Sequence, residues 1–224
     1  MNLLALDSSA SFLSAALFCN NNIYYSEIEA HMKHSEVIMD SIDNLMKKAL
    51  LKPQDLNGVL CTGGPGSFTG LRIGYSTAKG LALSLSIPFA PVPTLDCIAW
   101  QYKNDLVLPV IQAGKNAFFY AFFREGNRIT KDKEADSAQI AKEIKFYNEK
   151  ITVTGPGSLF LQDSLPGELK NIIAFNTEKK GYAKEVISIA QYRKIMDNDN
   201  TAYLYSGPDY IRLSDAEAAQ AQRV

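Results

Sequence analysis

The amino-acid sequence predicts an α/β fold made of two lobes with the same order of elements, βββαβα. Short apolar runs typical of strands alternate with amphipathic runs typical of helices along the chain. The tetrapeptide Gly-Pro-Gly-Ser occurs at 64–67 and again at 155–158, after a strand-like run each time. We therefore expect an N-terminal lobe over 1–104 and a C-terminal lobe over 105–224, whose last segment can pack back on the first lobe.

The first half of the chain reads as three strands, a helix, a strand and a helix. Apolar runs at 2–6, 12–19 and 23–28 predict the strands, and the asparagines at 20–22 tolerate the positive φ of a tight turn. Apolar residues at three- and four-residue steps predict a helix from Ser35 to Leu50, before Pro53. A buried strand at 59–62 then meets a glycine turn, and a second helix runs from Gly70 until Pro88 ends it.

The second half repeats this order after a short helix at 95–100 and a boundary at Asn104-Asp105. Strands are predicted at 106–112, 118–123 and from 128 to 130, and helical periodicity covers 135–147. A strand at 151–154 enters the second glycine turn. A strand at 171–175 and a helix at 183–196 close the half, which supports a duplicated architecture.

Composition indicates an ordinary soluble protein. The 224 residues are 46% hydrophobic and 21% charged, and no apolar run reaches the roughly 18 residues of a membrane span. With no signal peptide at the N-terminus, we expect a cytoplasmic protein. A net charge of -1 provides no general attraction for nucleic acid. Three separated cysteines (Cys19, Cys61 and Cys97) predict buried, reduced thiols rather than disulfides or a thiolate metal site.

The second helix carries a small residue at every fourth position. These residues are Gly70, Gly74, Ala78, Ala82 and Ser86. On a helix they form one shallow stripe, and glycine costs about 1 kcal/mol relative to alanine in a helix interior. We therefore interpret the stripe as a surface that lets another backbone come close.

The residues around the glycine turn carry a family resemblance. The two-lobed architecture resembles the actin, Hsp70 and sugar-kinase (ASKHA) superfamily. The run Gly-Pro-Gly-Ser-Phe-Thr-Gly-Leu-Arg-Ile-Gly at 64–74, with His-Ser-Glu at 34–36 before it and Ala-Lys-Gly-Leu at 78–81 after it, is similar to the bacterial TsaB (YeaZ) family. Pro-Asp-Tyr-Ile-Arg at 208–212 matches a further family segment. This family is the noncatalytic relative of the threonylcarbamoyl transferase TsaD.

The resemblance implies an adaptor in the formation of threonylcarbamoyladenosine beside the anticodon of tRNA. It implies dimerisation with a TsaD homologue, assembly with the ATPase TsaE, a homodimer in isolation and tRNA contact only through the complex. It implies no intrinsic cofactor, with ATP or ADP only at the joint with TsaD. The partner interface that it implies comprises His34, Val37, Ile38, Ile42, Leu45, Gly70, Leu71, Arg72, Gly74, Tyr75, Ala78 and Ala82.

Two turns of the chain are candidates for binding nucleotide phosphates. The first-strand turn of Asp7, Ser8 and Ser9 matches the superfamily's phosphate turn, but a kinase also needs acids from the other lobe, where Gln-Ala-Gly stands at 112–114 instead of the Asp-Ala-Arg of many relatives. The glycine turn is followed by Leu71-Arg72 rather than Lys and Ser or Thr, so it is not a P-loop. We expect its residues to turn the chain and cap the next helix; they are Gly63, Gly64, Gly66, Ser67 and Thr69.

Two alternatives stay open beside the adaptor. One is a small-molecule kinase, ATPase or metallopeptidase of the same fold, and the other is a stand-alone tRNA-binding module. His31 and His34 would share a helical face, but zinc needs at least three protein ligands, and TsaD uses a wider His-x-x-x-His pair. We therefore predict no metal site and no catalytic residue.

Overall fold

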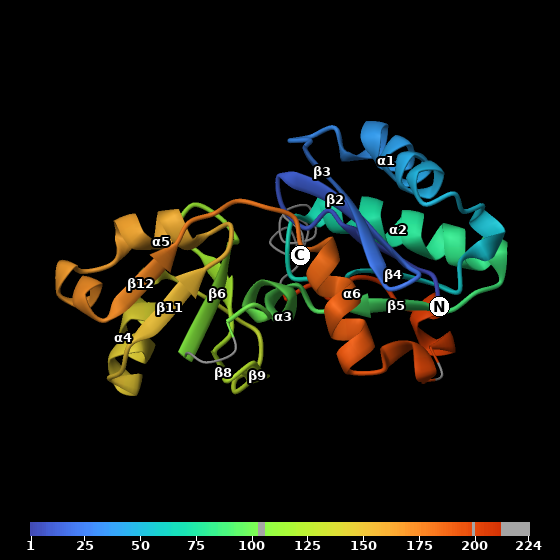
Figure 1. Ribbon diagram of the computed structural model, residues 1–224. Helices are drawn as coiled ribbons and strands as arrows, with labels where there is room; N and C mark the ends of the chain where they lie inside the picture. Colours follow the sequence, from blue (N-terminus) through green and yellow to red (C-terminus); the bar gives the residue numbers. More distant parts are fainter. Residues whose placement is uncertain (103–105, 199, 212–224) are drawn as a thin grey trace, which may run out of the picture.

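The computed structural model describes residues 1–102, 106–198 and 200–211, and it contains two lobes that each hold one sheet (Figure 1). The strands of the first sheet are β1 (Leu3–Asp7), β2 (Phe12–Cys19), β3 (Asn22–Glu29), β4 (Gly58–Thr62) and β5 (Phe89–Val92). Their spatial order is β3-β2-β1-β4-β5. The β1–β2 and β2–β3 pairs are antiparallel, whereas β4 is parallel to β1 and to β5. The predicted boundary at Asn104-Asp105 lies outside the described residues.

The second sheet repeats this arrangement. Its main strands are β6 (Leu106–Gln112), β7 (Phe118–Tyr120), β10 (Lys133–Ala135), β11 (Ile151–Thr154) and β12 (Ile173–Asn176), in the order β10-β7-β6-β11-β12. Two short strands, β8 (Phe123–Arg124) and β9 (Asn127–Arg128), pair beside β6. The β6–β7 pair is antiparallel and the β6–β11 pair is parallel, as at the corresponding places of the first sheet. The predicted duplicated α/β fold is therefore confirmed.

Six α-helices are found among the described residues. They are α1 (His34–Lys48), α2 (Phe68–Leu85), α3 (Thr94–Ala99), α4 (Ser137–Tyr147), α5 (Ser158–Ser164) and α6 (Ala183–Tyr192). Short 3-10 turns occur at Pro53–Asp55, Gly167–Asn171, Ile195–Asp197 and Thr201–Tyr205. Within the part of the chain that is described, none of the helices has the length and apolar character needed to cross a membrane.

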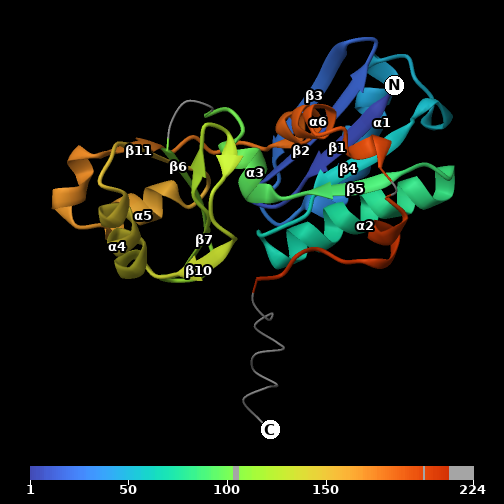
Figure 2. The same ribbon diagram turned by 90° about the horizontal axis from the view of Figure 1, so that it is seen from below.

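Alternation along each central strand places a helical layer on both faces of the sheet. In β1, Leu4 and Leu6 face the core beneath α1 and α2, whereas Leu3 and Ala5 face the core that contains α6. Figure 2 shows α6 on one side of the first sheet and α2 on the other. Because successive side chains of a strand point to opposite faces, a strand buried on both sides is apolar throughout, as the run Leu3–Leu6 is.

Helices α3 and α6 form a layer that both lobes share. Val107 of β6 belongs to the same buried cluster as Leu3 of β1, together with side chains of α3 and α6, whereas Leu108 faces a separate core beneath α4 and α5. One apolar core therefore continues from the first sheet to the second, and the two lobes are packed together rather than merely linked.

Three predicted elements differ from the structure. The run predicted as one strand at 118–123 is divided into β7 and β8, because the amide of Phe122 turns away to bond Oγ1 of Thr130 at 2.8 Å. The third strand, predicted to begin at Arg128, is instead two separate strands: β9, which pairs with β8, and β10, which pairs with β7. The helix expected over 183–196 ends at Tyr192, because Lys194 adopts a left-handed conformation.

Helix α6 follows the strands of the second lobe in sequence but packs on the first sheet. Side chains from three strands accept its first amides: Glu27 bonds Gly181 N at 2.7 Å, Asp7 bonds Tyr182 N at 2.8 Å, and Ser14 bonds Ala183 N at 3.1 Å. The first amides of a helix have no partner within the helix, so these acceptors fix its start on the sheet. Here Gly181 is required for close approach, since a Cβ would overlap Cβ and Oγ of Ser14.

We predict that Gly181→Ala lowers the free energy of unfolding by about 2 kcal/mol, because the added methyl group separates α6 from β2. Urea unfolding followed by circular dichroism measures the change. Gly167→Ala is the matched control, since a Cβ there meets nothing within 4 Å. Equal stability of the two variants would contradict the packing described for Gly181.

The three cysteines are free and buried, as their spacing predicts. Burial raises the pKa of the Cys61 thiol, and the nearby charge of Asp7 raises it further. The pKa of Cys97 is also raised well above its ordinary value, first by burial. Since the thiolate is the reactive form, both residues are protected by position and by protonation.

We predict that the folded chain does not react with 5,5′-dithiobis(2-nitrobenzoate) at pH 8, whereas three thiols per chain react in concentrated urea. Raising the pH to about 9 leaves the folded chain unreactive, because the thiol pKa values of Cys61 and Cys97 lie above the ordinary range. Rapid reaction of a thiol in the native state would show that this part of the core opens readily.

Candidate functional site

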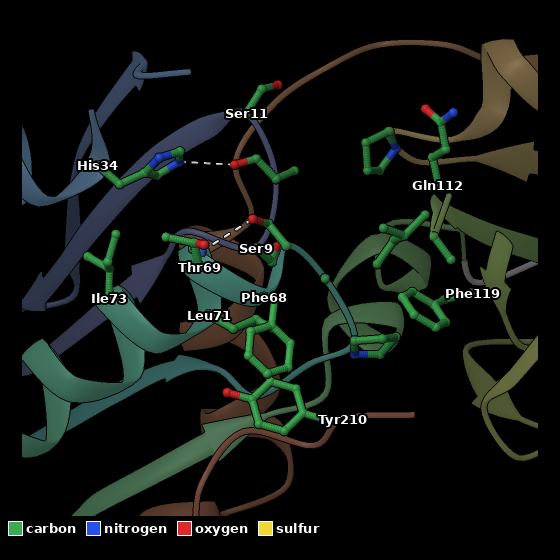
Figure 3. Close-up of a pocket in the computed structure, with 18 of the residues that line it drawn as sticks. Ser9, Ser11, His34, Phe68, Thr69, Leu71, Ile73, Gln112, Phe119 and Tyr210 are labelled. Atoms are coloured by element: carbon green, nitrogen blue, oxygen red, sulfur yellow. Dashed lines mark hydrogen bonds between the residues drawn. The ribbon is translucent and has the colours of Figure 1, made fainter. Parts of the chain in front are cut away.

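A cleft of about 650 Å³ lies between the lobes, where the two glycine turns approach each other (Figure 3). The first lobe contributes the turn after β1, the start of α1 and the first turn of α2. The second lobe contributes Gln112, Phe119, Pro156 and Phe160, and the C-terminal segment contributes residues 209–211. Ser9, part of the phosphate-turn candidate after the first strand, also lines this cleft.

The first glycine turn uses its amides for packing within the chain. Gly63 N bonds the carbonyl oxygen of Val92 at 2.8 Å, and Gly64 N bonds Oγ1 of Thr94 at 3.2 Å. Ser67 N bonds the carbonyl oxygen of Ser9 at 2.7 Å, so the turn is fixed to the end of β1. These three amides are therefore not available to an anion.

The same turn begins α2 through one of the two predicted caps. Ser67 Oγ accepts a hydrogen bond from Gly70 N at 3.2 Å and so caps the helix. Thr69 lies within the first turn, is exposed and lines the cleft. Gly66 is needed because a Cβ there would stand 2.6 Å from the carbonyl oxygen of Ser9. The glycines thus bring two backbones together.

Asp7, the candidate phosphate-turn acid, is 1% exposed and accepts hydrogen bonds from four donors. Its Oδ1 accepts from Ser9 N at 3.0 Å, Ser9 Oγ at 2.7 Å and Thr62 Oγ1 at 2.9 Å. Its Oδ2 accepts from Tyr182 N at 2.8 Å, at the start of α6. Ser8 lies between Asp7 and Ser9 in this turn, and its Oγ donates a hydrogen bond to the carbonyl oxygen of Gly70 at 2.8 Å. All three side chains are engaged inside the protein.

The matching turn of the second lobe carries no carboxylate. Gln112 ends β6, is exposed and lines the cleft, and its Nε2 donates to the carbonyl oxygen of Gly114 at 3.1 Å. Gly157 of the second glycine turn packs against it, since a Cβ there would stand 2.8 Å from Gln112 N. The repeated tetrapeptide therefore marks two turns that each pack against the end of the first strand of their lobe.

The two histidines are not arranged as ligands. His31 lies before α1 with a φ of 45°, so it does not share a helical face with His34, contrary to the spacing argument. His34 is the first residue of α1, is 5% exposed and has Nε2 3.0 Å from the carbonyl oxygen of Ala10. Among the described residues, no three His, Cys, Asp or Glu side chains are grouped as a metal site.

Four of the five residues of the small-residue stripe are buried within their own lobe, and the fifth, Ser86, is exposed just after the end of α2; the stripe is therefore not the surface for a partner that the sequence predicts. A Cβ at Gly70 would overlap the carbonyl oxygen of Ser8, and one at Gly74 would overlap Ser8 Oγ. Ala78 and Ala82 are fully buried in the core of the lobe. The close backbone approach is present, but the neighbour is the turn after β1.

The same correction applies to most of the other predicted interface residues. Those buried in the core or against the sheet of their own lobe are His34, Ile38, Ile42, Leu45, Leu71 and Tyr75. Val37 is partly buried and Arg72 is exposed. Helical periodicity identified an apolar face on each helix correctly, but that face is occupied by the sheet.

Other residues form the outer face of these helices, and we define this outer face by Val37, Ile73, Thr77, Gly80 and Leu81. The four side chains are partly buried, and a Cβ at Gly80 would meet nothing within 4 Å. Gly80 was missed because it lies outside the four-residue repeat. The sequence signal for Gly80 is a glycine in the middle of a predicted helix, away from the face that carries the small residues.

The C-terminal segment packs back on the first lobe along α2, through individual contacts that the sequence did not predict. The ring of Tyr210 stacks on Phe68 with centroids 4.3 Å apart, and Asp209 N bonds the carbonyl oxygen of Gly63 at 2.8 Å. Arg72 lies over Phe68 and its Nε donates to Tyr210 Oη at 3.2 Å. Arg72 thus interacts with aromatic rings of its own chain. Arg212 lies outside the described residues.

Comparison with known proteins shows that this chain is similar to proteins named for one tRNA modification. Residues 21–219 match the family model described as TsaD, tRNA N6-adenosine threonylcarbamoyltransferase. A Bacillus subtilis protein named tRNA threonylcarbamoyladenosine biosynthesis protein TsaB is 26% identical over 97% of both chains. A Syntrophotalea carbinolica tRNA N6-adenosine threonylcarbamoyltransferase is 32% identical over 50% of this chain and 38% of its own length.

The fold agrees with a solved structure of the same group. A Pseudomonas aeruginosa protein described as similar to peptidase YeaZ superposes with a TM-score of 0.81, at 19% identity, over 94% of this chain and 99% of its own. A structure described as YeaZ from the same organism gives a TM-score of 0.80. Because the family model described as TsaD matches residues 21–219, this chain belongs to that family, within which it is similar over nearly its whole length to proteins named TsaB and YeaZ.

Proposed function

We propose that the chain is a noncatalytic adaptor in the biosynthesis of threonylcarbamoyladenosine in tRNA, and that it acts by pairing with a TsaD-type transferase. The similarity to a TsaB protein over 97% of both chains carries the proposal. The chemistry of the cleft supports the noncatalytic part. Asp7 is occupied by four internal donors, and the matching turn of the second lobe offers Gln112 in place of an acid.

Phosphoryl transfer in a cleft of this kind requires charge stabilisation on both sides of the phosphates. The amides of Gly63, Gly64 and Ser67 are used by the chain itself, as is the carboxylate of Asp7. A kinase or ATPase would therefore lack free amides and a free carboxylate in the first lobe, and it would lack an acid at the matching turn of the second lobe. In the proposed complex, ATP or ADP binds only at the joint with the transferase, where the partner supplies the missing groups.

We assign the transferase contact to the outer face of α1 and α2. The support is physical: Gly80 is an open glycine beside the partly buried apolar side chains of Ile73 and Leu81, so a helix of a partner can approach closely. A transferase that is similar to about half of this chain offers a related lobe, which favours pairing through like surfaces. The same face would support a homodimer in isolation, while the TsaE-type ATPase and tRNA bind the assembled complex.

We predict that Gly80→Trp abolishes co-purification with a TsaD-type partner and removes the stimulation of tRNA modification in a reconstituted reaction. The indole fills the space that the partner helix needs, while the fold is kept because nothing lies within 4 Å of the new Cβ. Gly167→Trp, at an equally open glycine in the second lobe, is the matched control. Undiminished pairing by the folded Gly80→Trp variant would reject this face as the interface.

We predict that the isolated chain and its Asp7→Asn variant release phosphate from Mg-ATP at the same background rate. The reason is that both oxygens of the Asp7 carboxylate already accept hydrogen bonds from donors inside the chain. Asn keeps the size of the side chain, and a melting curve confirms folding of the variant. A phosphate release rate that is clearly above background and falls with Asp7→Asn would establish intrinsic catalysis and overturn the adaptor proposal.

A further inference from the structure

The junction of the lobes contains a carboxylate that two arginines share. Asp96 of α3 is 4% exposed. Its Oδ1 accepts from Nε of Arg128 at 2.9 Å and also from Nη2 of that residue, and its Oδ2 accepts from Nη1 of Arg193 at 2.6 Å. Each carboxylate oxygen is thus held by a different guanidinium, an arrangement with strong, directional hydrogen bonds.

The three residues of this cluster come from three different parts of the fold. Arg128 belongs to β9, which pairs with β8 beside the second sheet. Arg193 directly follows α6, which packs on the first sheet. Asp96 lies on α3, in the layer between the sheets (Figure 1). Asp96 therefore connects a residue of the second lobe with a helix of the first.

The surroundings keep Arg128 charged and in position. Asp132 forms a second ion pair with it, and its guanidinium lies over the ring of Phe123, 4.8 Å from the centroid. Burial disfavours the charge of Arg128, but the carboxylates of Asp96 and Asp132 outweigh burial, so the pKa of the guanidinium lies above its ordinary value. A buried charge that loses its partner is strongly unfavourable, so a rotation that separates Arg128 from Asp96 is opposed.

A second polar contact ties the two segments that cross between the lobes. Tyr102 follows α3 on the first crossing, and its Oη accepts from Nδ2 of Asn176, where the second crossing begins. The same oxygen lies 3.3 Å from Oγ1 of Thr154 at the end of β11. Together with the apolar core shared through α3 and α6, this contact joins the described end of the first crossing segment to the start of the second.

We infer that the Asp96 cluster is a lock that holds the two lobes at one opening, so that the chain docks as a rigid body and its cleft does not close on a ligand. Hinge closure normally uses a few connecting residues that absorb the motion, and here Tyr102 and Asn176, one on each connection, are bonded to each other. The inference concerns lobe motion within the chain and does not depend on the identity of the partner or on the proposed interface.

The test measures the distance between the lobes in the full-length chain. Spin labels are attached to cysteines introduced at Asn44 on α1 and Lys142 on α4, which are exposed, while the native cysteines are buried. Double electron–electron resonance is recorded for the wild-type background and for Asp96→Asn, each with and without Mg-ATP. Asp163→Asn, at an exposed position of α5, is the matched control.

We expect one narrow distance for the wild-type background and for Asp163→Asn, unchanged by Mg-ATP, and a second, shifted distance for Asp96→Asn. A narrow, unshifted distance in folded Asp96→Asn would overturn the lock, as would two distances or a shift with Mg-ATP in the wild-type background. Arg128→Lys replaces Asp96→Asn in case that variant does not fold. The lysine keeps a positive charge but cannot reproduce the two hydrogen bonds that Arg128 donates to Oδ1 of Asp96. A second, shifted distance in this variant supports the lock, and a narrow, unshifted distance overturns it.

Discussion

The carboxylate of Asp7 is the contact on which the architecture depends. It joins the turn after β1 to Thr62 at the end of β4 and to the amide of Tyr182, the N-cap residue of α6. Since α6 covers one face of the first sheet and also contacts α3, this bond fixes the layer that both lobes share. The Asp7 carboxylate, which was a candidate ligand for the metal ion of a bound nucleotide, instead fixes the start of α6.

The same constraint determines what the cleft offers. Ser8, beside Asp7, reaches the first turn of α2, and Ser9 binds the amide of Ser67, so the glycine turn is pulled onto the end of β1. The glycines permit that approach and their amides are used by it. What remains in the cleft is a mixture of neutral polar, apolar and aromatic side chains, with Lys179 and Asp209 as its charged groups.

Local patterns predicted most elements, because periodicity and turn chemistry act over a few residues. The asparagine turn at 20–22 has the positive φ expected at Asn20 and Asn21, and the repeated Gly-Pro-Gly-Ser marks equivalent turns. Long-range contacts were beyond such reasoning: the bond from Asp7 to Tyr182 spans 175 residues. The stripe on α2 showed a face of close approach but not which backbone covers it, so ten buried positions were assigned to a partner while Gly80 was missed.

The shared middle layer also has a consequence for the order of folding during synthesis. The first sheet is assembled from residues 3–92, yet α6, which covers one of its faces, is made about 90 residues later. Until then Leu3, Ala5 and Leu60 lack the helix that buries them. The N-terminal lobe therefore reaches its native state only when nearly the whole chain has left the ribosome, and pairing before that point would involve an incomplete surface.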